Sequence, residues 1–547
     1  MRVAQNQPFY ASQRLSKTAS RDMSKQADSR KNLLLPHITR WEPSQGYIAS
    51  LTDVHKAFGN KVVLDGINLN IEVGKTTVII GQSGSGKSVL IKHLNALLHP
   101  DSGTVTLFGE DCAKLKTPQL YALRMRTGMI LQDYALMDSM SVFENIAFPI
   151  EENSRMSRKQ QRELVREILT PLDLVDAMDK FPSELSGGMK KRVSFARALI
   201  HQPELVLFDE PTTGLDPLMI VFVDELIKEL RRKYALSSVI ISHDIQSIFR
   251  LADRVAYLHE GKIIFEGTPN EALISPLEPL QRFFNAENLV ERETPADSHK
   301  NAVIRVKDLH KSFGEKAVLK GIDLEIPEKK ITVIIGGSGS GKSVLLKHVL
   351  GLFVADSGEL WVEGLELSKT NEKERVMLRT RMGMLFQGAA LFDSMTIAQN
   401  IAFPLRERVD SLSSKEAQKR VNEMLEQLKI EDIAHAFPSE ISAGQRKRVG
   451  LARAIITKPK IMIYDEPTTG QDPIMIRYVD DMILEAHKTF GLTSIVISHD
   501  MTSTFRIADQ IAMVYEGKIA QVGTPAKFLT SQNPEVQRFI RAGGIAS

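Results

Sequence analysis

Short apolar runs alternate with longer amphipathic stretches along the chain. TTVII at 76–80 and ELVLF at 204–208 are continuous apolar runs next to glycine or acidic residues, a pattern typical of buried parallel strands. SVLIKHLNALL at 88–98 and the charged stretch at 155–178 have helical periodicity instead. Because strands and helices alternate in this way, the sequence predicts an α/β fold with a parallel sheet.

The whole pattern occurs twice. VHKAFGNKVVLDGINLNI at 54–71 returns as LHKSFGEKAVLKGIDLEI at 309–326, and FPSELSGGMKKRVSFARALI at 181–200 returns as FPSEISAGQRKRVGLARAII at 437–456. A repeat of about 240 residues is much longer than the unit of a solenoid, so it indicates the tandem duplication of a complete domain. The predicted organisation is a tail (1–46), a first half (47–286), a polar linker (287–301) and a second half (302–547).

Composition and charge exclude several classes of protein. The 547 residues are 43% hydrophobic and 25% charged, as in ordinary globular proteins. The net charge is only +3, and residues 1–45 carry eight basic against three acidic residues, so the rest of the chain is nearly neutral. A neutral body argues against a nucleic-acid-binding surface. We expect the basic tail to be disordered, with organelle targeting or contact with anionic lipid as alternatives.

Cysteine content and hydropathy add two further exclusions. Cys112 is the only cysteine, so an internal disulfide and a cysteine-rich zinc site are both excluded. A membrane-spanning helix needs about 20 consecutive apolar residues, and no run approaches that length. We therefore expect a soluble protein that can sit on a membrane through a partner.

Two glycine-rich segments fit the phosphate-binding pattern G-x-x-x-x-G-K-[ST]: GQSGSGKS at 81–88 and GGSGSGKS at 336–343, here called the first and second phosphate loops. Each follows an apolar run and precedes a helical stretch, so backbone N–H groups can surround phosphate oxygens at a helix N-terminus. The lysines can reach the β- and γ-phosphates of ATP, and the last serine of each loop can hold Mg²⁺. The residues expected to bind nucleotide here are Gly81, Gln82, Ser83, Gly84, Ser85, Gly86, Lys87 and Ser88 in the first loop, and Gly336, Gly337, Ser338, Gly339, Ser340, Gly341, Lys342 and Ser343 in the second.

An acidic pair follows each loop at the end of a second apolar run, LVLFDEP at 205–211 and IMIYDEP at 461–467. Asp209 and Asp465 suit the shell of the Mg²⁺ ion, together with Ser88 and Ser343. Glu210 and Glu466 are placed to polarise the attacking water.

The order of these motifs resembles that of ABC-transporter nucleotide-binding domains. The resemblance rests on LSGGMKKR at 185–192 and ISAGQRKR at 441–448, here called the signature segments, each followed by DEPTTG[LQ]DP. It implies two domains, each with a parallel-sheet core, an antiparallel β part and a helical subdomain. It also implies that Gln132 and Gln387 contact Mg²⁺ and water, that His243 and His499 contact the γ-phosphate, and that Phe58 and Phe313 stack on adenine.

In this family two domains bind ATP between them, each phosphate loop facing the signature segment of the other. The resemblance therefore implies that the two halves pair within one chain. Ser186, Gly187 and Gly188 would complete the site of Lys342, and Ser442, Ala443 and Gly444 that of Lys87. Because Ala443 stands where the first half has Gly187, we also expect the two ATP sites to be unequal.

The segments after the loop glutamines, YALMDSMSVFENIAFPIEE at 134–152 and AALFDSMTIAQNIAFPLRE at 389–407, point to one branch of the family. With HDxxSxFRxAD at 243–253 and 499–509 they resemble the Mla-type ATPases, which serve phospholipid transport linked to MCE proteins in the bacterial envelope. This implies integral permease subunits as partners and a peripheral position on the cytoplasmic face of the inner membrane. We expect some of the apolar residues in these segments to line a docking groove and the rest to lie in the core: Met137, Phe143, Phe148, Phe392 and Phe403.

Other readings of twin ABC domains remain. Another ABC transporter class is the main alternative, although twin-domain sugar importers usually have a degraded second phosphate loop. Ribosome-associated twin ABC proteins carry a long charged insert between their halves, and the linker here is too short for one. ABC proteins of DNA repair would need zinc-binding cysteines.

Overall fold

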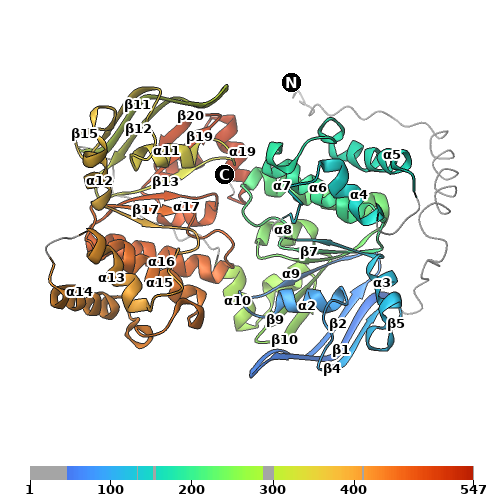
Figure 1. Cartoon of the computed structure of the whole chain (residues 1–547). Helices are drawn as coiled ribbons and strands as arrows, with labels where there is room; N and C mark the ends of the chain where they lie inside the picture. Colours follow the sequence, from blue (N-terminus) through green and yellow to red (C-terminus); the bar gives the residue numbers. More distant parts are fainter. Residues whose placement is uncertain (1–45, 132–133, 152–155, 287–300, 409–411, 546–547) are drawn as a thin grey trace, which may run out of the picture.

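The computed structural model describes residues 46–131, 134–151, 156–286, 301–408 and 412–545, and Figure 1 shows that they form two lobes. The first half makes one lobe and the second half makes the other. Nearly all of the predicted tail and of the predicted linker lies outside the described residues. Within the described part, no helix is both long and apolar enough to cross a bilayer.

Each half contains a four-stranded antiparallel sheet and a six-stranded, mainly parallel sheet. In the first half their strand orders are β2-β1-β4-β5 and β10-β9-β3-β8-β7-β6. Only β10 runs antiparallel in the larger sheet, against β9. The strands are β1 (Tyr47–Phe58), β2 (Lys61–Glu72), β3 (Thr76–Ile80), β4 (Ser102–Leu107), β5 (Glu110–Asp111), β6 (Thr127–Ile130), β7 (Leu205–Asp209), β8 (Ser237–Ile241), β9 (Arg254–His259) and β10 (Lys262–Gly267).

The second half repeats this topology strand for strand. Its sheets have the orders β12-β11-β14-β15 and β16-β17-β18-β13-β19-β20. The strands are β11 (Ala302–Phe313), β12 (Lys316–Pro327), β13 (Ile331–Ile335), β14 (Ser357–Val362), β15 (Leu365–Glu366), β16 (Met382–Leu385), β17 (Ile461–Asp465), β18 (Thr493–Ile497), β19 (Gln510–Tyr515) and β20 (Lys518–Gly523).

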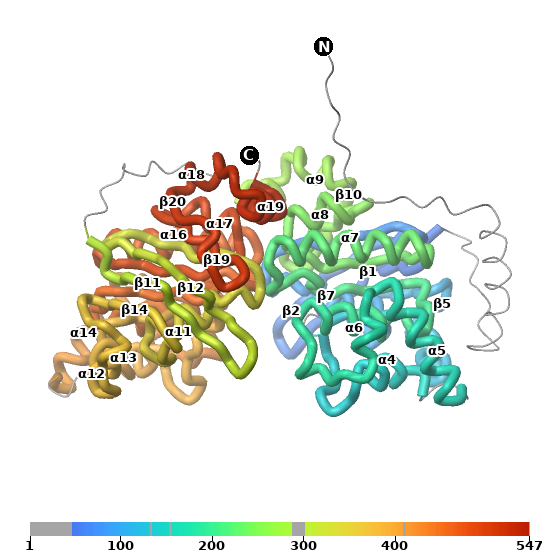
Figure 2. Tube along the Cα trace, turned by 90° about the horizontal axis from the view of Figure 1, so that it is seen from above, coloured from blue at the N-terminus to red at the C-terminus, as the bar shows by residue number. Residues whose placement is uncertain are grey.

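Helices pack on the larger sheets and form the rest of each lobe (Figures 1 and 2). In the first half they are α2 (Lys87–Leu94), α3 (Thr117–Arg124), α4 (Val142–Glu151), α5 (Arg158–Leu169), α6 (Gly187–Leu199), α7 (Pro217–Tyr234), α8 (Ile245–Leu251), α9 (Pro269–Ile274) and α10 (Glu278–Asn285). In the second half they are α11 (Lys342–Val349), α12 (Glu372–Thr380), α13 (Ile397–Arg408), α14 (Ser414–Gln427), α15 (Ala443–Ile455), α16 (Pro473–Phe490), α17 (Met501–Ile507), α18 (Pro525–Leu529) and α19 (Pro534–Ala542).

The predicted α/β fold is confirmed, with small differences in element boundaries. The run at 76–80 is β3, and the run at 204–208 is β7 shifted by one residue. The helix expected over 155–178 is α5, which ends at Leu169 and gives way to two short 3₁₀ turns at 170–172 and 175–177. Pro171 explains the early end, because proline cannot continue the hydrogen-bond ladder of a helix.

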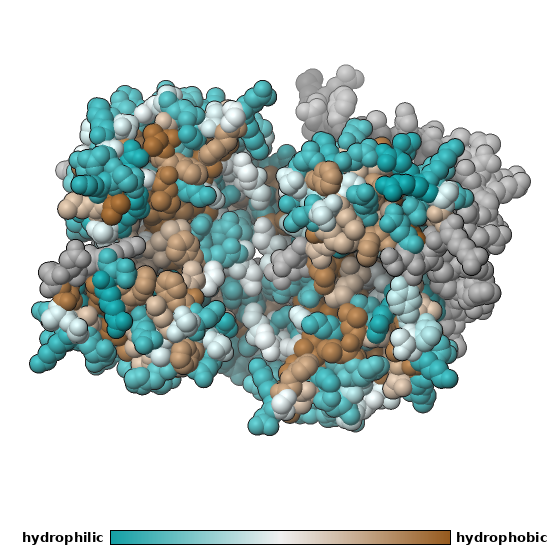
Figure 3. Space-filling view, viewed as in Figure 1, coloured by the Kyte–Doolittle hydropathy of each residue, from teal (hydrophilic) through white to brown (hydrophobic). Residues whose placement is uncertain are grey.

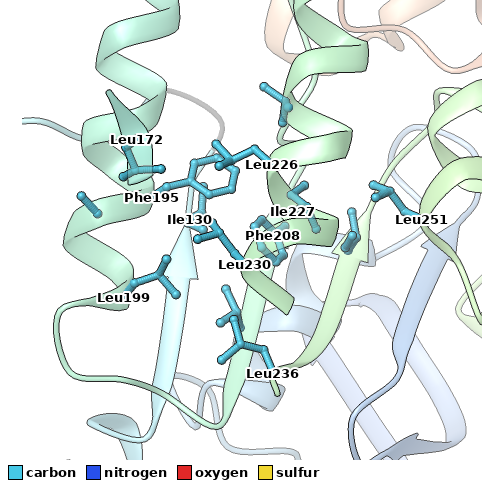
Figure 4. Close-up of a cluster of buried hydrophobic side chains, with 14 of the residues drawn as sticks. Ile130, Leu172, Phe195, Leu199, Phe208, Leu226, Ile227, Leu230, Leu236 and Leu251 are labelled. Carbon is cyan, nitrogen blue, oxygen red and sulfur yellow. The ribbon is translucent and has the colours of Figure 1, made fainter. Parts of the chain in front are cut away.

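The cores lie between the larger sheets and their helices. β3 and β8 are buried along their full length, as parallel strands covered on both faces must be. Figure 4 shows how Ile130 of β6 and Phe208 of β7 meet Phe195 of α6 and Leu226 of α7. The rings of Phe195 and Phe208 lie 5.6 Å apart. This packing holds the ends of the strands, where the chemistry lies, in fixed positions.

The two halves exchange their last helices. α10 of the first half packs on α16, and α19 of the second half packs on α7. Figure 1 shows α10 and α19 at the junction of the lobes. Arg250 donates a hydrogen bond to the carbonyl oxygen of Ala542 at 3.3 Å, and Arg506 donates to that of Ala286. Each arginine is also paired with a fully buried aspartate, Asp224 or Asp480. Both ends of the interface are therefore anchored by the same ion-paired contact.

Candidate nucleotide-binding sites

The phosphate loops lie between β3 and α2 and between β13 and α11, as the sequence predicts. Gly81 has φ +154°, and a Cβ built on it would lie 2.2 Å from the carbonyl oxygen of Leu258, so only glycine fits there. Gly86 caps α2 with φ +105°. Ser85 Oγ and Ser340 Oγ are buried without a hydrogen-bond partner among the described residues. Unpaired hydroxyls and free helix N-termini fit a bound phosphate chain.

The two lysines point back into their own loops. Lys87 Nζ donates to the carbonyl oxygens of Gly81 and Gln82 at 2.8 and 2.9 Å, and Lys342 repeats both contacts at 2.8 and 3.0 Å. Burial lowers the pKa of both lysines, while Glu210 and Glu466 act in the opposite direction. Each ammonium group is thus already desolvated where an anion would be bound. Because the local dielectric constant is low, its electrostatic attraction for phosphate is stronger there than in water.

The acidic pairs lie at the carboxyl ends of β7 and β17. Glu210 and Glu466 have φ +51° and +47°, a left-handed conformation that costs about 1–3 kcal/mol for a residue with a side chain. Glu210 Oε1 lies 3.6 Å from Nδ1 of His243, and its Oε2 accepts a hydrogen bond from Thr213 Oγ1 at 3.0 Å. In the second half, His499 lies 3.7 Å from Glu466, and Thr469 donates at 3.2 Å.

The pKa values of the two carboxyl groups in each pair move apart. Burial, followed by the neighbouring glutamate, raises the pKa of Asp209 and of Asp465. Burial opposes ionisation of Glu210, but contacts from His243 and Thr213 hold its pKa below the usual range. The contact from His499 does the same for Glu466. Both glutamates are therefore ionised at neutral pH and able to accept a proton from water.

These residues fit Mg²⁺ that arrives with a nucleotide. No group of three or more metal-ligating side chains occurs among the residues that the structure describes, so a preformed protein cage is absent from them. Mg²⁺ usually keeps several waters and binds through one or two carboxylates plus phosphate oxygens. One aspartate and one serine hydroxyl per site, Asp209 with Ser88 and Asp465 with Ser343, match that pattern.

Each phosphate loop is touched by the other half. The carboxylate of Asp472 accepts a hydrogen bond from the backbone N–H of Ser83 at 2.8 Å, and Asp216 accepts from Ser338 at 2.8 Å. Both aspartates are buried and also cap the helices α16 and α7. A cavity of about 100 Å³ at the junction is lined by residues of both halves, including His243 and His499. The two candidate sites thus face each other across the junction.

The signature segments begin the helices α6 and α15. Ser186 accepts from the backbone N–H of Met189 at 3.3 Å, and Ser442 accepts from that of Gln445 at 3.2 Å. Gly187 and Ala443 are exposed, while Gly188 is half-buried and Gly444 buried. Among the described residues, no hydrogen bond joins a signature segment to the opposite phosphate loop. Their role across the interface stays a prediction.

The remaining predicted residues lie around the same sites. Phe58 and Phe313 are 50% and 46% exposed at the ends of β1 and β11. Lys56 and Lys311 each lie 5.7 Å from the centre of the ring two residues on, so the side of each ring away from the lysine is the one left for a base. Gln387 is exposed, and its carbonyl oxygen accepts a hydrogen bond from Lys447. Gln132 lies outside the described residues.

Sequence reasoning missed the residues that join the parts of each site. Asp216 and Asp472 were not singled out, although both belong to the repeated DEPTTG[LQ]DP string. Lys447 connects Gln387 to the carbonyl oxygen of Pro467, which it reaches at 2.9 Å. Burial lowers the pKa of this lysine to about 8. Repetition was the available signal for all of them, because Lys447 also has a counterpart, Lys191, in the repeated signature segment.

The segments predicted to dock a partner are partly exposed. Phe143 is only 1% exposed, so it belongs to the core, whereas Phe148 is 37% and Phe392 41% exposed. Met137 and Phe148 line a cavity of about 420 Å³ with His201. In the second half Phe403 is half-buried, and its ring lies 4.7 Å from that of Phe392. Figure 3 shows apolar side chains toward the middle of each lobe and hydrophilic ones along their junction.

The fold should lose stability in weak acid through His201. Burial lowers the pKa of His201 to about 4, below the usual value near 6.5, so its stabilising effect is lost as pH falls from about 6.5 toward 4. At pH 5 the cost is at most about 2 kcal/mol. The second half has Thr457 at this position. The melting temperature of His201→Thr should fall less between pH 7 and pH 5 than that of the wild type; an equal fall would contradict the prediction.

Comparison with known proteins agrees with these features. The model of the family described as ABC transporter matches residues 64–213 and 319–469. A putative ABC transporter ATP-binding protein of Vibrio parahaemolyticus is 31% identical, over 87% of this chain and 89% of the relative. The peptidoglycan transport ATP-binding protein YejF of Agrobacterium fabrum is 28% identical, over 90% and 94%. Among solved structures, cbiO1 of Clostridium perfringens, part of the ABC transporter complex cbiONQ, covers 45% of this chain at 28% identity and a TM-score of 0.40.

Proposed function

The chain belongs to the ABC transporter family, and from that premise we propose that this single polypeptide supplies the complete pair of ATPase domains of one membrane transporter. ABC ATPase domains hydrolyse ATP, so the chain is an enzyme. The observation that carries the pairing is the reciprocal contact of Asp216 and Asp472 with the opposite phosphate loops. Each half holds part of the other half's site.

The proposed roles follow from the geometry of each site. The backbone of the phosphate loop and Lys87 or Lys342 bind the β- and γ-phosphates. Mg²⁺, when bound, neutralises charge on the phosphates and on the oxygen that leaves. Glu210 and Glu466, ionised and held by a histidine and a threonine, orient the attacking water and accept its proton.

We further propose a permease as the membrane partner and phospholipid as the cargo. Proteins of this family generally work with integral permease subunits. The lipid assignment is supported by the resemblance of residues 134–152 and 389–407, and of both HDxxSxFRxAD strings, to the Mla-type ATPases. The printed name of the Agrobacterium relative, a peptidoglycan transport protein, makes a peptidoglycan fragment the rival cargo.

Affinity purification from detergent-solubilised membranes of the source organism tests the proposal. The recovered complex should contain an integral membrane protein. It should also contain more phospholipid per amount of recovered protein than a mock purification does. Recovery of the same membrane protein with peptidoglycan fragments instead would keep the transporter and overturn the lipid assignment. Co-sedimentation with ribosomes and no membrane protein would overturn both.

Docking should depend on the exposed aromatic residues and not on the buried one. Phe148→Glu and Phe392→Glu remove apolar contacts at the surface. Each variant should keep its melting temperature and its ATPase activity. In a flotation assay, however, it should no longer float with the membranes. Phe143→Glu is the matched control. It places a charge in the core, which should cost several kcal/mol and unfold the first half. Normal flotation of both surface variants would contradict the prediction.

A further inference from the structure

The second half contains a cavity that is separate from both ATP sites. It has a volume of about 590 Å³ and lies between β11 and β12 on one side and β19, β20 and the start of α18 on the other, at the upper left of Figure 1. Its walls include Val306, Leu324, Pro327 and Val522, and the first two are almost fully buried. None of its lining residues belongs to a phosphate loop.

The first half fills the equivalent space. The corresponding residues there surround only about 80 Å³. Four side chains make the difference: Tyr47, Glu72, Arg254 and Glu266 stand where the second half has Ala302, Pro327, Gln510 and Val522. Arg254 lies 3.7 Å from Glu72, so a charged pair occupies the space in the first half.

These four replacements lie around the same cavity although they are far apart in the sequence. One tyrosine and three charged side chains are all replaced by smaller or uncharged ones, and all four line the same cavity. The amide that replaces Arg254 is hydrogen-bonded, because Gln510 donates to the carbonyl oxygen of Glu325 at 3.1 Å. The walls of the cavity therefore combine apolar side chains with polar ones, and the introduced Gln510 is not left unpaired.

The rim of the cavity carries two lysines that the first half lacks, and its three basic residues balance its three acidic ones in number. Lys307 and Lys527 replace Thr52 and Glu271, and neither ammonium group has an ion pair among the described residues. The acidic residues of the rim are engaged. Glu325 pairs with Arg305 at 3.0 Å, Asp509 accepts from the backbone N–H of Ile331 at 2.8 Å, and Asp323 accepts from that of Asp308 at 3.0 Å.

We propose that this cavity binds a small amphiphile with an apolar body and one anionic group. Its volume falls in the range of small-molecule sites, about 300–1,000 Å³. Ala302 and Val522 receive the apolar body, and Lys307 with Lys527 binds the anion. A fatty acid and an aromatic carboxylate share this chemistry. The site does not depend on the proposed transport function, because its test measures binding to the purified chain.

A fluorescence titration of the full-length chain with 1-anilinonaphthalene-8-sulfonate, an apolar aromatic anion, tests the site. Ala302→Tyr combined with Val522→Glu restores two first-half residues and should weaken binding at least about tenfold. Lys527→Glu, at an exposed position, should weaken it about fivefold. Lys518→Glu, the same charge reversal on β20 but outside the cavity lining, is the matched control and should bind as the wild type does.

ATPase activity and the melting temperature report whether each variant is folded. If the double variant does not fold, Lys527→Glu against Lys518→Glu decides the question. Displacement of the probe by laurate, but not by benzoate, would assign a fatty acid, and the reverse would assign an aromatic carboxylate. Absence of saturable binding to the wild type, or equal binding to Lys527→Glu and Lys518→Glu, would overturn the proposal.

Discussion

Lys87→Ala and Lys342→Ala should each slow steady-state ATP hydrolysis by about a hundredfold or more, as removal of a single charged group at a transition state commonly does. Each lysine is buried among the carbonyl oxygens of its own loop, ready to bind phosphate. Asp216 and Asp472 connect each phosphate loop to the other half. We therefore expect loss of either lysine to reduce hydrolysis at both sites. Activity per chain, measured by phosphate release, checks this.

Mixing the two lysine variants should restore little activity. The halves are joined by a short linker and by exchanged helices, so the partner within the chain is present at a far higher effective concentration than any other chain. Pairing between chains would create one intact pair from two defective ones. Activity of the mixture above about a tenth of the wild type would therefore show that halves pair between chains.

Glu466→Gln should reduce ATPase activity more than Glu210→Gln does. The two glutamates have nearly the same surroundings, with histidine at 3.6 and 3.7 Å and threonine at 3.0 and 3.2 Å. A difference in ATPase activity between the two sites must then come from the signature segment that faces each site. Ala443 is proposed to face the site of Glu210. One extra methyl in a tight contact costs about 1–3 kcal/mol, which corresponds to roughly 5- to 150-fold in rate. The site of Glu466 would then carry most of the turnover.

The fold of each half does not itself account for that cost. A Cβ on Gly187 would meet only the hydroxyl of Tyr134, at 3.7 Å, so the fold of the half itself tolerates a methyl group there. We therefore expect the penalty only against nucleotide bound across the junction. Ala443→Gly is the control, because it should bring the two glutamine variants to equal activity. A larger loss in Glu210→Gln, or equal losses before that change, would contradict the asymmetry.

Local features were predictable from the sequence because their signals are local. Continuous apolar runs gave β3 and, within one residue, β7, and the glycine patterns placed both phosphate loops at helix starts. Phe143 could have been assigned to the core, because it and Phe148 are five residues apart on α4 and so point to different sides of the helix. Hydrophobicity alone does not separate the two.

Contacts between distant segments could not be predicted in this way. Ser338 and Asp216 are 122 residues apart, and Ser83 and Asp472 are 389 apart, so their meeting depends on how the lobes pack. The same holds for the cavity of the second half, whose lining residues range from Asn301 to Lys527. Each of its four key replacements is an ordinary surface change until the fold brings them together.

The cavity has a consequence for stoichiometry. In a dimer of identical ATPase subunits every substitution appears twice, so a site formed on one subunit must also exist on the other. Fusion removes this constraint, because Ala302 and Tyr47 are separate codons of one gene. The chain can therefore bind one amphiphile for every two ATP molecules, a ratio that no symmetric pair can have through equivalent sites.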